Sequence, residues 1–375
     1  MSRTQNLTLL IIHGIGQQQE FETLDLFTRN LIHALHQHTG ASIHLKHCHR
    51  PGKPETENFI RLECSNPTPT QINIHEYYWA PTSQRSISFK ETFQWLLRAS
   101  SGARQFYQTH QELAIQYEWS QQTQKTDSLY LKKVGGVTER LGTLPLSYQR
   151  LPRWLDPWIR LAMSKPEQLV VDYLGDVATY TTTDKRLQQY ATRLKILDGA
   201  IDKVRCLLKD NCEHLILIGH SLGSIITYDV LNRIHLAIKT DPLFTEHHKA
   251  FTKLITFGSP LDKVAFFLRD QTPASAYIKR WMVDNLLSYR QLAPSLSFPP
   301  YVHAEPMIHP LLENMPWENY WDPKDPISGP LDTYTHVKNI KVDNGFSWGY
   351  AHTGYWTNQR IYLQGIASIL DEIKK

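Results

Sequence analysis

The chain has 375 residues, of which 41% are hydrophobic and 20% are charged, and its formal net charge is +4. These values describe a globular chain that can bury a large core, as two ordinary domains or as one α/β domain with a large insertion. The small net charge and the lack of a Lys/Arg block argue against a nucleic-acid partner. The four cysteines have no framework spacing, which predicts reduced thiols in a cytoplasmic protein.

The sequence contains no apolar stretch of the ~18–20 residues that a membrane span needs. Its first apolar run is short and leads into His13 and Gly14 rather than into a cleavage site, so it does not resemble a signal peptide. Any contact with lipid is therefore expected at the protein surface.

The first 80 residues predict strands around one helix. The apolar run 7–12 ends near a glycine and predicts a buried parallel strand. Strands are also expected at 43–49 and 72–79, with the proline-containing segment 50–70 interpreted as a loop. Between the first two strands, apolar residues recur at helical spacing and predict one buried helix face: Phe21, Leu24, Phe27, Leu31 and Leu35.

From 82 to 180 the strand–helix alternation disappears and helical patterns dominate, which we interpret as an insertion within a single domain spanning 1–375. A long helix follows at 184–208, with apolar positions at alternating steps of three and four from Leu187 onward. Further strands are expected at 215–218, 253–257, 317–321 and 336–342, and a helix at 360–373. The pattern predicts an α/β fold with a mostly parallel sheet flanked by helices.

The motif with the clearest chemistry is Gly219-His-Ser-Leu-Gly223. Four apolar residues precede it and a helical pattern follows it, which is the strand–turn–helix context of a nucleophile elbow. The serine of such a turn has a strained backbone, and the flanking glycines avoid a collision between strand and helix. We therefore predict Ser221 as the nucleophile of an α/β-hydrolase, supported by Gly219, His220 and Gly223, with the insertion as a helical cap over the site.

A serine nucleophile needs a histidine base and an acid that orients the base. In this fold the acid and then the histidine follow the serine, in loops at the same sheet edge. His352 lies between the last predicted strand and the closing helix, so we predict it as the base. Asp325 lies a few residues beyond a predicted strand and is the favoured acid, while Asp322 and Asp262 remain alternatives.

The oxyanion of the reaction needs two backbone N–H donors. One donor belongs to Leu222, which follows the nucleophile. The other is expected from the glycine-containing loop after the first strand, where we choose the amide of Ile15 and expect Gly14 to permit a close approach. The chemistry calls for no metal or organic cofactor. The histidines that crowd the region before residue 50 match no common zinc-ligand spacing.

Together these residues resemble the α/β-hydrolase serine lipases and, within them, the intracellular DDHD-type phospholipase A1 family. The matching pieces keep their order along the chain: Ile12-His-Gly-Ile-Gly-Gln17, Gly175-Asp-Val177 with Tyr180, the segment 219–229, Phe257-Gly-Ser-Pro260, Asp325-Pro-Ile327, Asp343, and His352 with Tyr355-Trp356. The last acidic position of the family motif has no acid here, because Thr357, Asn358 and Gln359 follow Trp356.

The resemblance implies a membrane-active acyl hydrolase that cleaves an acyl ester of a glycerophospholipid, with peripheral membrane contact through the cap. It implies the triad Ser221, Asp325 and His352, and it places Asp343 at the second aspartate of the family motif. Alternative functions are an acyl-protein thioesterase, a small-ester carboxylesterase, and a non-catalytic module on the same scaffold that binds lipid or protein.

Overall fold

The computed structural model describes residues 5–14, 18–40, 42–51, 57–65, 69–83, 176–182, 185–210, 212–262, 276–286, 289–290, 298–303, 310–325, 327–332, 334–346, 351–368 and 370. The chain divides into two compact units. The first consists of Met1–Thr82, Leu194–Asp262 and Trp281–Lys375, and the second of Ser83–Arg193 and Lys263–Arg280. All the residues predicted to form the site belong to the first unit.

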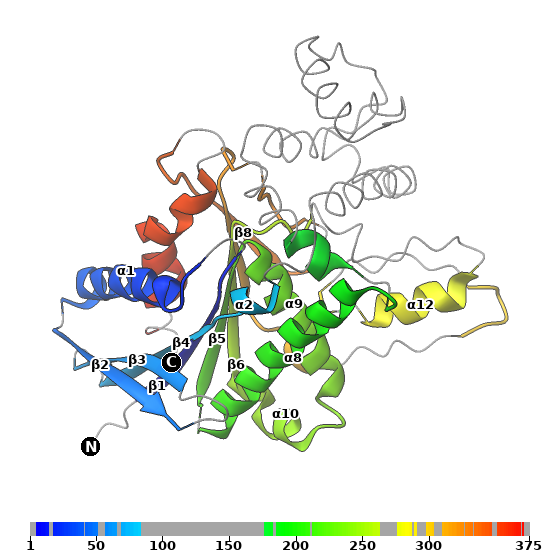
Figure 1. The fold of residues 1–375 in the computed structure, drawn as a ribbon, viewed down its shortest axis with the longest axis horizontal. Coiled ribbons are helices and arrows are strands. Elements are labelled where there is room, and N and C mark those ends of the chain that lie inside the picture. The colour runs from blue at the N-terminus through cyan, green and yellow to red at the C-terminus, as the bar shows by residue number, and fades with distance from the viewer. Residues whose placement is uncertain are drawn as a thin grey trace, which may run out of the picture. The chain divides into compact units, whose positions relative to one another are not determined.

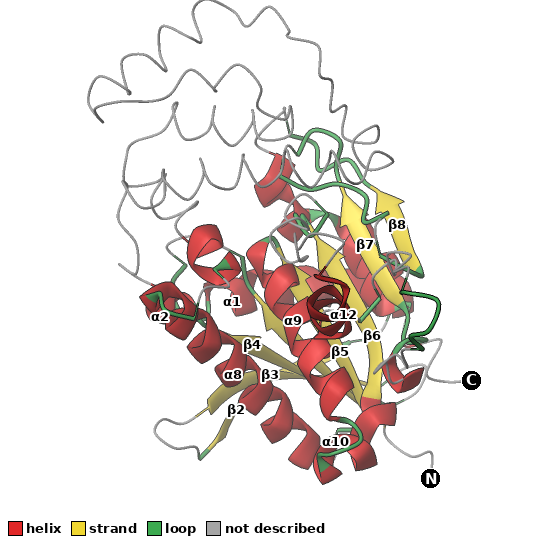
Figure 2. Ribbon diagram, turned by 90° about the vertical axis from the view of Figure 1, so that its right-hand side faces the viewer, coloured by secondary structure: helices red, strands yellow, loops and turns green. Residues whose placement is uncertain are grey.

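An eight-stranded sheet with the strand order β2-β3-β4-β1-β5-β6-β7-β8 organises the first unit (Figure 2). The strand β3 pairs antiparallel with β2 and β4, and all the other pairs are parallel. The strands are β1 (Gln5–Ile12), β2 (Ile43–Arg50), β3 (Glu57–Cys64), β4 (Thr70–Tyr77), β5 (His214–His220), β6 (Phe251–Phe257), β7 (Trp317–Trp321) and β8 (Val337–Lys341).

The parallel strands end together along one edge of the sheet. Ile12 of β1 pairs with Gly219 of β5, and His220 of β5 pairs with Phe257 of β6. Phe257 in turn pairs with Tyr320 of β7. The turns that leave these strands therefore start close together, and this edge is where ligands bind in open α/β sheets.

Helices flank the sheet on both faces (Figure 1). On one face lie α1 (Glu22–Thr39) and the C-terminal π-helix η6 (Ile361–Ala367), and on the other lie α9 (Leu222–Ala237) and the part of α8 (Gln188–Lys209) from Leu194 onward. The described residues also contain α2 (Ala80–Ser83), α10 (Pro242–His247), α12 (Tyr277–Leu286), η2 (His248–Ala250), η4 (Pro310–Leu312), η5 (Ala351–Thr357) and a short helical segment at 176–181.

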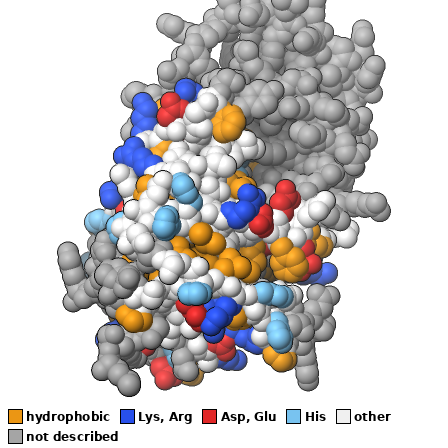
Figure 3. Space-filling model, turned by 90° about the vertical axis from the view of Figure 1, so that its left-hand side faces the viewer, with side chains coloured by type: hydrophobic (Ala, Val, Ile, Leu, Met, Phe, Trp, Pro, Cys, Tyr) orange, Lys and Arg blue, Asp and Glu red, His pale blue; other side chains and the backbone are white. Residues whose placement is uncertain are grey.

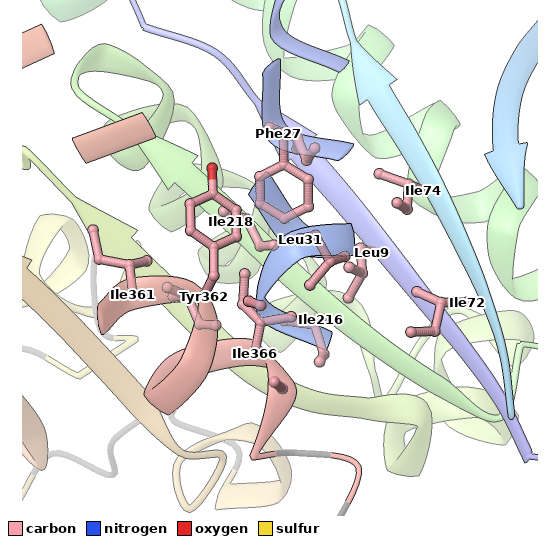
Figure 4. Close-up of a cluster of buried hydrophobic side chains, with 14 of the residues drawn as sticks. Leu9, Phe27, Leu31, Ile72, Ile74, Ile216, Ile218, Ile361, Tyr362 and Ile366 are labelled. Atoms are coloured by element: carbon pink, nitrogen blue, oxygen red, sulfur yellow. The ribbon is translucent and has the colours of Figure 1, made fainter. Parts of the chain in front are cut away.

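Apolar side chains fill the space between the sheet and the α1–η6 layer (Figure 4). Phe27 and Leu31 of α1 and Tyr362 of η6 meet Ile216 and Ile218 of β5, and all five are buried. Each large side chain buried in this way stabilises the fold by about 1.5–3 kcal/mol. This packing holds β5, which carries the elbow, in the middle of the sheet.

Most predicted elements are present, but the interpretation of 50–70 as a loop is wrong. This segment contains β3, whose buried residues Phe59, Leu62 and Cys64 do not follow a simple alternation. Two side chains expected on buried helix faces lie outside them: Phe21 precedes α1 with φ 69° and is 41% exposed, and Leu187 precedes α8 and is 42% exposed. The closing helix forms, with π geometry over Ile361–Ala367.

Of the predicted insertion 82–180, residues 84–175 lie outside the described residues, so its helical character and its role as a cap stay predictions. No helix in the described part of the chain is long and apolar enough to cross a membrane. All four cysteines are free thiols.

Candidate active site

Ser221 occupies a strained turn between β5 and α9. Its backbone dihedrals are φ 52° and ψ −125°, a conformation that residues other than glycine rarely adopt. A Cβ atom on Gly219 would lie 2.6 Å from Ser224 Cα, and one on Gly223 would lie 2.1 Å from the carbonyl oxygen of Ile12. Only glycine fits at these two positions, so the turn has the geometry that the motif predicts.

The structure brings Ser221, His352 and Asp325 together from three different turns. Ser221 Oγ lies 2.9 Å from His352 Nε2, and His352 Nδ1 lies 2.8 Å from Asp325 Oδ2. All three side chains are buried. A carboxylate can only accept, so Nδ1 carries the imidazole proton and Nε2 is left to accept the proton of the serine hydroxyl.

Several contacts keep Asp325 ionised and fixed. Its Oδ1 accepts a hydrogen bond of 2.9 Å from the backbone N–H of Ile327, and its Oδ2 accepts one of 2.9 Å from the hydroxyl of Tyr355. Burial raises the pKa of Asp325, but the neighbouring His352 ring, together with hydrogen bonds from the backbone N–H of Ile327 and from the hydroxyl of Ser328, outweighs burial and holds the pKa below its usual range. The carboxylate therefore stays charged at neutral pH.

The two alternative acids are engaged elsewhere. Asp322 accepts hydrogen bonds from the backbone N–H groups of Lys324, at 2.8 Å, and Asn344, at 2.7 Å, which makes it a turn residue after β7. Asp262 accepts one from the backbone N–H of Asp332 at 3.0 Å. Of the three predicted candidates, Asp325 is the one whose carboxylate contacts His352.

Of the two predicted oxyanion donors, one, the backbone N–H of Leu222, lies among the described residues. Leu222 is the first residue of α9, where a backbone N–H has no acceptor within its own helix. Ile15 lies outside the described residues. A Cβ atom on Gly14 would lie 2.7 Å from Ser221 Cβ, so the loop after β1 approaches Ser221 as closely as glycine allows.

His13 fixes that loop, a role that the sequence did not reveal. Its Nε2 accepts a hydrogen bond from the backbone N–H of Trp79 at 3.2 Å, so Nδ1 carries the proton and donates to the carbonyl of Gly14 at 2.8 Å. Burial lowers the pKa of His13 to about 4, and the ring stacks on the indole of Trp79. A neutral imidazole therefore ties the loop to the turn after β4.

His220, predicted as a supporting residue, connects the elbow to the histidine turn. Its Nε2 donates to the backbone carbonyl of His352 at 3.2 Å. Burial, together with the nearby His352 ring, lowers the pKa of His220 to about 3, so the imidazole is neutral. The ring packs against Phe257 and Trp356.

Asp343, which the sequence resemblance places at the second aspartate of the DDHD-type motif, lies at an exposed turn after β8. Its carboxylate accepts from the backbone N–H of Gly345 at 2.9 Å and pairs with Lys324 Nζ at 3.0 Å. This turn precedes the segment that carries His352, so the contacts of Asp343 are those of a turn-forming residue.

The described residues contain no group of three or more His, Cys, Asp or Glu side chains that could hold a metal ion. On the face that Figure 3 shows, histidines are scattered among apolar and charged side chains.

Comparison of the sequence with protein-family models gives no match, and comparison with curated proteins gives none either. A function for this chain therefore has to be argued from the geometry of Ser221, His352 and Asp325.

Proposed function

We propose that this chain is a serine hydrolase of the α/β-hydrolase fold that acts on carboxylic ester bonds. The observation that carries the proposal is the continuous hydrogen-bonded chain from Ser221 Oγ through His352 to Asp325. The strained turn at Ser221, the mostly parallel sheet and the chain order Ser, Asp, His support the proposal.

The geometry suits acyl transfer through an acyl-enzyme. Ser221 Oγ attacks the ester carbonyl while its proton passes to His352 Nε2, and the Asp325 carboxylate stabilises the imidazolium that forms. The amide of Leu222, with that of Ile15, is expected to stabilise the oxyanion of the tetrahedral intermediate. His352 then gives its proton to the leaving alcohol, and the acyl group stays on the serine.

Water completes the cycle: it now acts as the nucleophile, and Ser221 Oγ becomes the leaving group. His352 Nε2 removes a proton from water, whose oxygen attacks the acyl carbon. Collapse of the second tetrahedral intermediate returns the proton to Ser221 Oγ and releases the carboxylic acid.

The proposed substrate is a lipid ester, with cleavage of the phospholipase A1 type in a cytoplasmic protein that contacts membranes peripherally. This part of the proposal depends on the resemblance of the ordered sequence blocks to the DDHD-type family.

Pre-steady-state hydrolysis of a chromogenic ester tests the proposal. We expect a burst of released alcohol close to one equivalent per protein, followed by slower turnover, because acylation by an activated chromogenic ester is faster than hydrolysis of the acyl-enzyme. Ser221→Ala should abolish both phases. Absence of hydrolysis by folded wild-type protein, with and without lipid micelles, would contradict the proposal and favour the non-catalytic module.

A substrate panel then separates the enzyme classes. A phospholipase A1-like enzyme releases the sn-1 acyl chain from aggregated phospholipid faster than it cleaves short esters. Faster turnover of acyl thioesters favours the thioesterase alternative, and faster turnover of dissolved short esters favours the carboxylesterase alternative.

A further inference from the structure

We propose that Tyr355 is a positioning residue for the reaction, because its hydroxyl holds the carboxylate of Asp325 in the orientation that His352 requires. This inference rests on the proposed function. It adds a fourth side chain to the hydrogen-bonded chain, one that the triad motif does not contain. Tyr355 and His352 lie on the same short helix, η5, and both contact the same atom, Asp325 Oδ2.

The hydrogen-bond partners fix the direction of each bond at the Tyr355 hydroxyl. The backbone N–H of Asp322, at 2.9 Å, can only donate, so the tyrosine oxygen accepts there. The Asp325 carboxylate can only accept, so the tyrosine proton points at Oδ2, also at 2.9 Å. The remaining lone pair faces the hydroxyl of Ser328 at 2.8 Å.

The tyrosine keeps its proton. Burial raises the pKa of Tyr355 well above its usual value, and the charge of Asp325 raises it further. The hydroxyl therefore acts as a permanent donor to the carboxylate throughout the catalytic cycle.

The ring of Tyr355 is held as firmly as its hydroxyl. It is fully buried and packs against Phe257 and His220. Gly258, with φ 63°, lies against it, and a Cβ atom at this position would come within 3.0 Å of the ring. The core of the sheet thus fixes the ring, and the backbone N–H of Asp322 and the hydroxyl of Ser328 fix the direction of the tyrosine proton.

The contrast with other buried tyrosines shows that this arrangement is not required for packing alone. The hydroxyl of Tyr362 donates to the backbone carbonyl of Trp356, and that of Tyr334 donates to the backbone carbonyl of Leu261. Tyr355 instead donates to the one carboxylate that contacts His352. A donor fixed at Oδ2 limits rotation of the carboxylate and keeps the imidazole proton on Nδ1.

Tyr355→Phe tests the proposal, with Tyr320→Phe as the matched control. Tyr320 is also fully buried and also donates a 2.9 Å hydrogen bond to a carboxylate, that of Glu318, which does not belong to the triad. Both variants lose one hydrogen bond to a buried carboxylate. We expect only Tyr355→Phe to lower kcat, by about tenfold or more with KM unchanged, because a hydrogen bond to a charged group is lost at the acid.

The low-field proton resonance of His352 Nδ1–H gives a second readout that needs no substrate. It should move in Tyr355→Phe, where Asp325 becomes a stronger acceptor, and stay in place in Tyr320→Phe. An unmoved resonance together with a kcat within twofold of that of Tyr320→Phe would overturn the positioning role. If wild-type protein hydrolyses no ester, the proposed function fails, while the resonance still decides the role of Tyr355.

A second variant covers the case in which Tyr355→Phe does not fold. Ser328→Ala removes one partner of the Tyr355 hydroxyl and leaves the ring in place; because Ser328 also hydrogen-bonds the Asp325 carboxylate, the variant loosens the same carboxylate from two sides. We expect it to lower kcat by about threefold and to move the same resonance. Unchanged kcat and an unchanged resonance in Ser328→Ala would then overturn the proposal.

Discussion

Asp325→Asn is the substitution that separates geometry from charge in the triad. Asparagine has the same shape, but one carboxylate oxygen becomes an NH2 group. The Oδ1 position accepts from the backbone N–H of Ile327 at 2.9 Å, so the amide oxygen is expected there and the NH2 group at the Oδ2 position. That NH2 group then faces His352 Nδ1, at the present distance of 2.8 Å. The Tyr355 hydroxyl, which donates to Oδ2 in the wild type, has to turn its proton to Ser328 and accept from the NH2 group.

The consequence is a change of imidazole tautomer. An NH2 group can only donate, so His352 Nδ1 must accept and the ring proton moves to Nε2. Nε2 then donates to Ser221 Oγ, at 2.9 Å in the wild type, and can no longer accept the serine proton. We expect kcat to fall by about 10⁴-fold, or about 5.5 kcal/mol, as for such a change in a serine protease triad.

Steady-state hydrolysis of an ester by folded variants checks this magnitude. Asp262→Asn is the matched control, because Asp262 is equally buried but its carboxylate accepts from the backbone N–H of Asp332. We expect the control to keep kcat within about tenfold of wild type. Retention of activity in Asp325→Asn, with its loss in Asp262→Asn, would refute the assignment of Asp325 and the tautomer argument with it.

Two further predictions concern the fold around the site. Gly223→Ala places a Cβ atom 2.1 Å from the Ile12 carbonyl oxygen, so we expect the free energy of unfolding, measured by urea denaturation, to fall by about 3 kcal/mol or more. A fall of less than ~1 kcal/mol would contradict the close approach. Glu76→Gln tests a buried carboxyl whose pKa burial raises to about 7 from 4.5. A raised acid pKa stabilises the fold at low pH, and this contribution is lost as the pH rises through 7. At pH 8 the free energy of unfolding of Glu76→Gln should therefore exceed that of wild type by up to about 3 kcal/mol, and this difference should disappear toward pH 4.5. A difference that does not change with pH would contradict the raised pKa of Glu76.

The periodicity of the sequence predicted most of the sheet, because buried parallel strands are short apolar runs that end at turns. The strand β3 was not predicted from the sequence, for two reasons. Its flanking segments are rich in proline, which suggested a loop, and its first residue Glu57 is charged. In the structure Glu57 pairs with His75 at 2.7 Å and with Lys203 of α8, contacts that join distant parts of the chain and that no local pattern reveals.

In the site, too, local sequence patterns predicted some residues, whereas contacts between residues far apart in the chain were not predictable. Ser221 was predictable because strand, turn and helix signals surround it, and His352 and Asp325 because turns after parallel strands meet at one edge. The resemblance includes Tyr355 among its matching residues, but its contact with Asp325 was not predictable, because only the folded chain shows which group its hydroxyl meets. The role of His220 likewise depends on a carbonyl 132 positions further along the chain.

The measurement that tests the central claim most directly is covalent labelling with a fluorophosphonate, followed by peptide mapping. Only a serine activated by a neighbouring base reacts readily with this reagent, so its reaction reports the Ser221–His352 contact itself. We predict one adduct per wild-type chain, on Ser221, absent in Ser221→Ala and strongly reduced in His352→Ala. A folded wild-type protein that forms no adduct, even with detergent micelles present, or that forms it on another residue, would contradict the account.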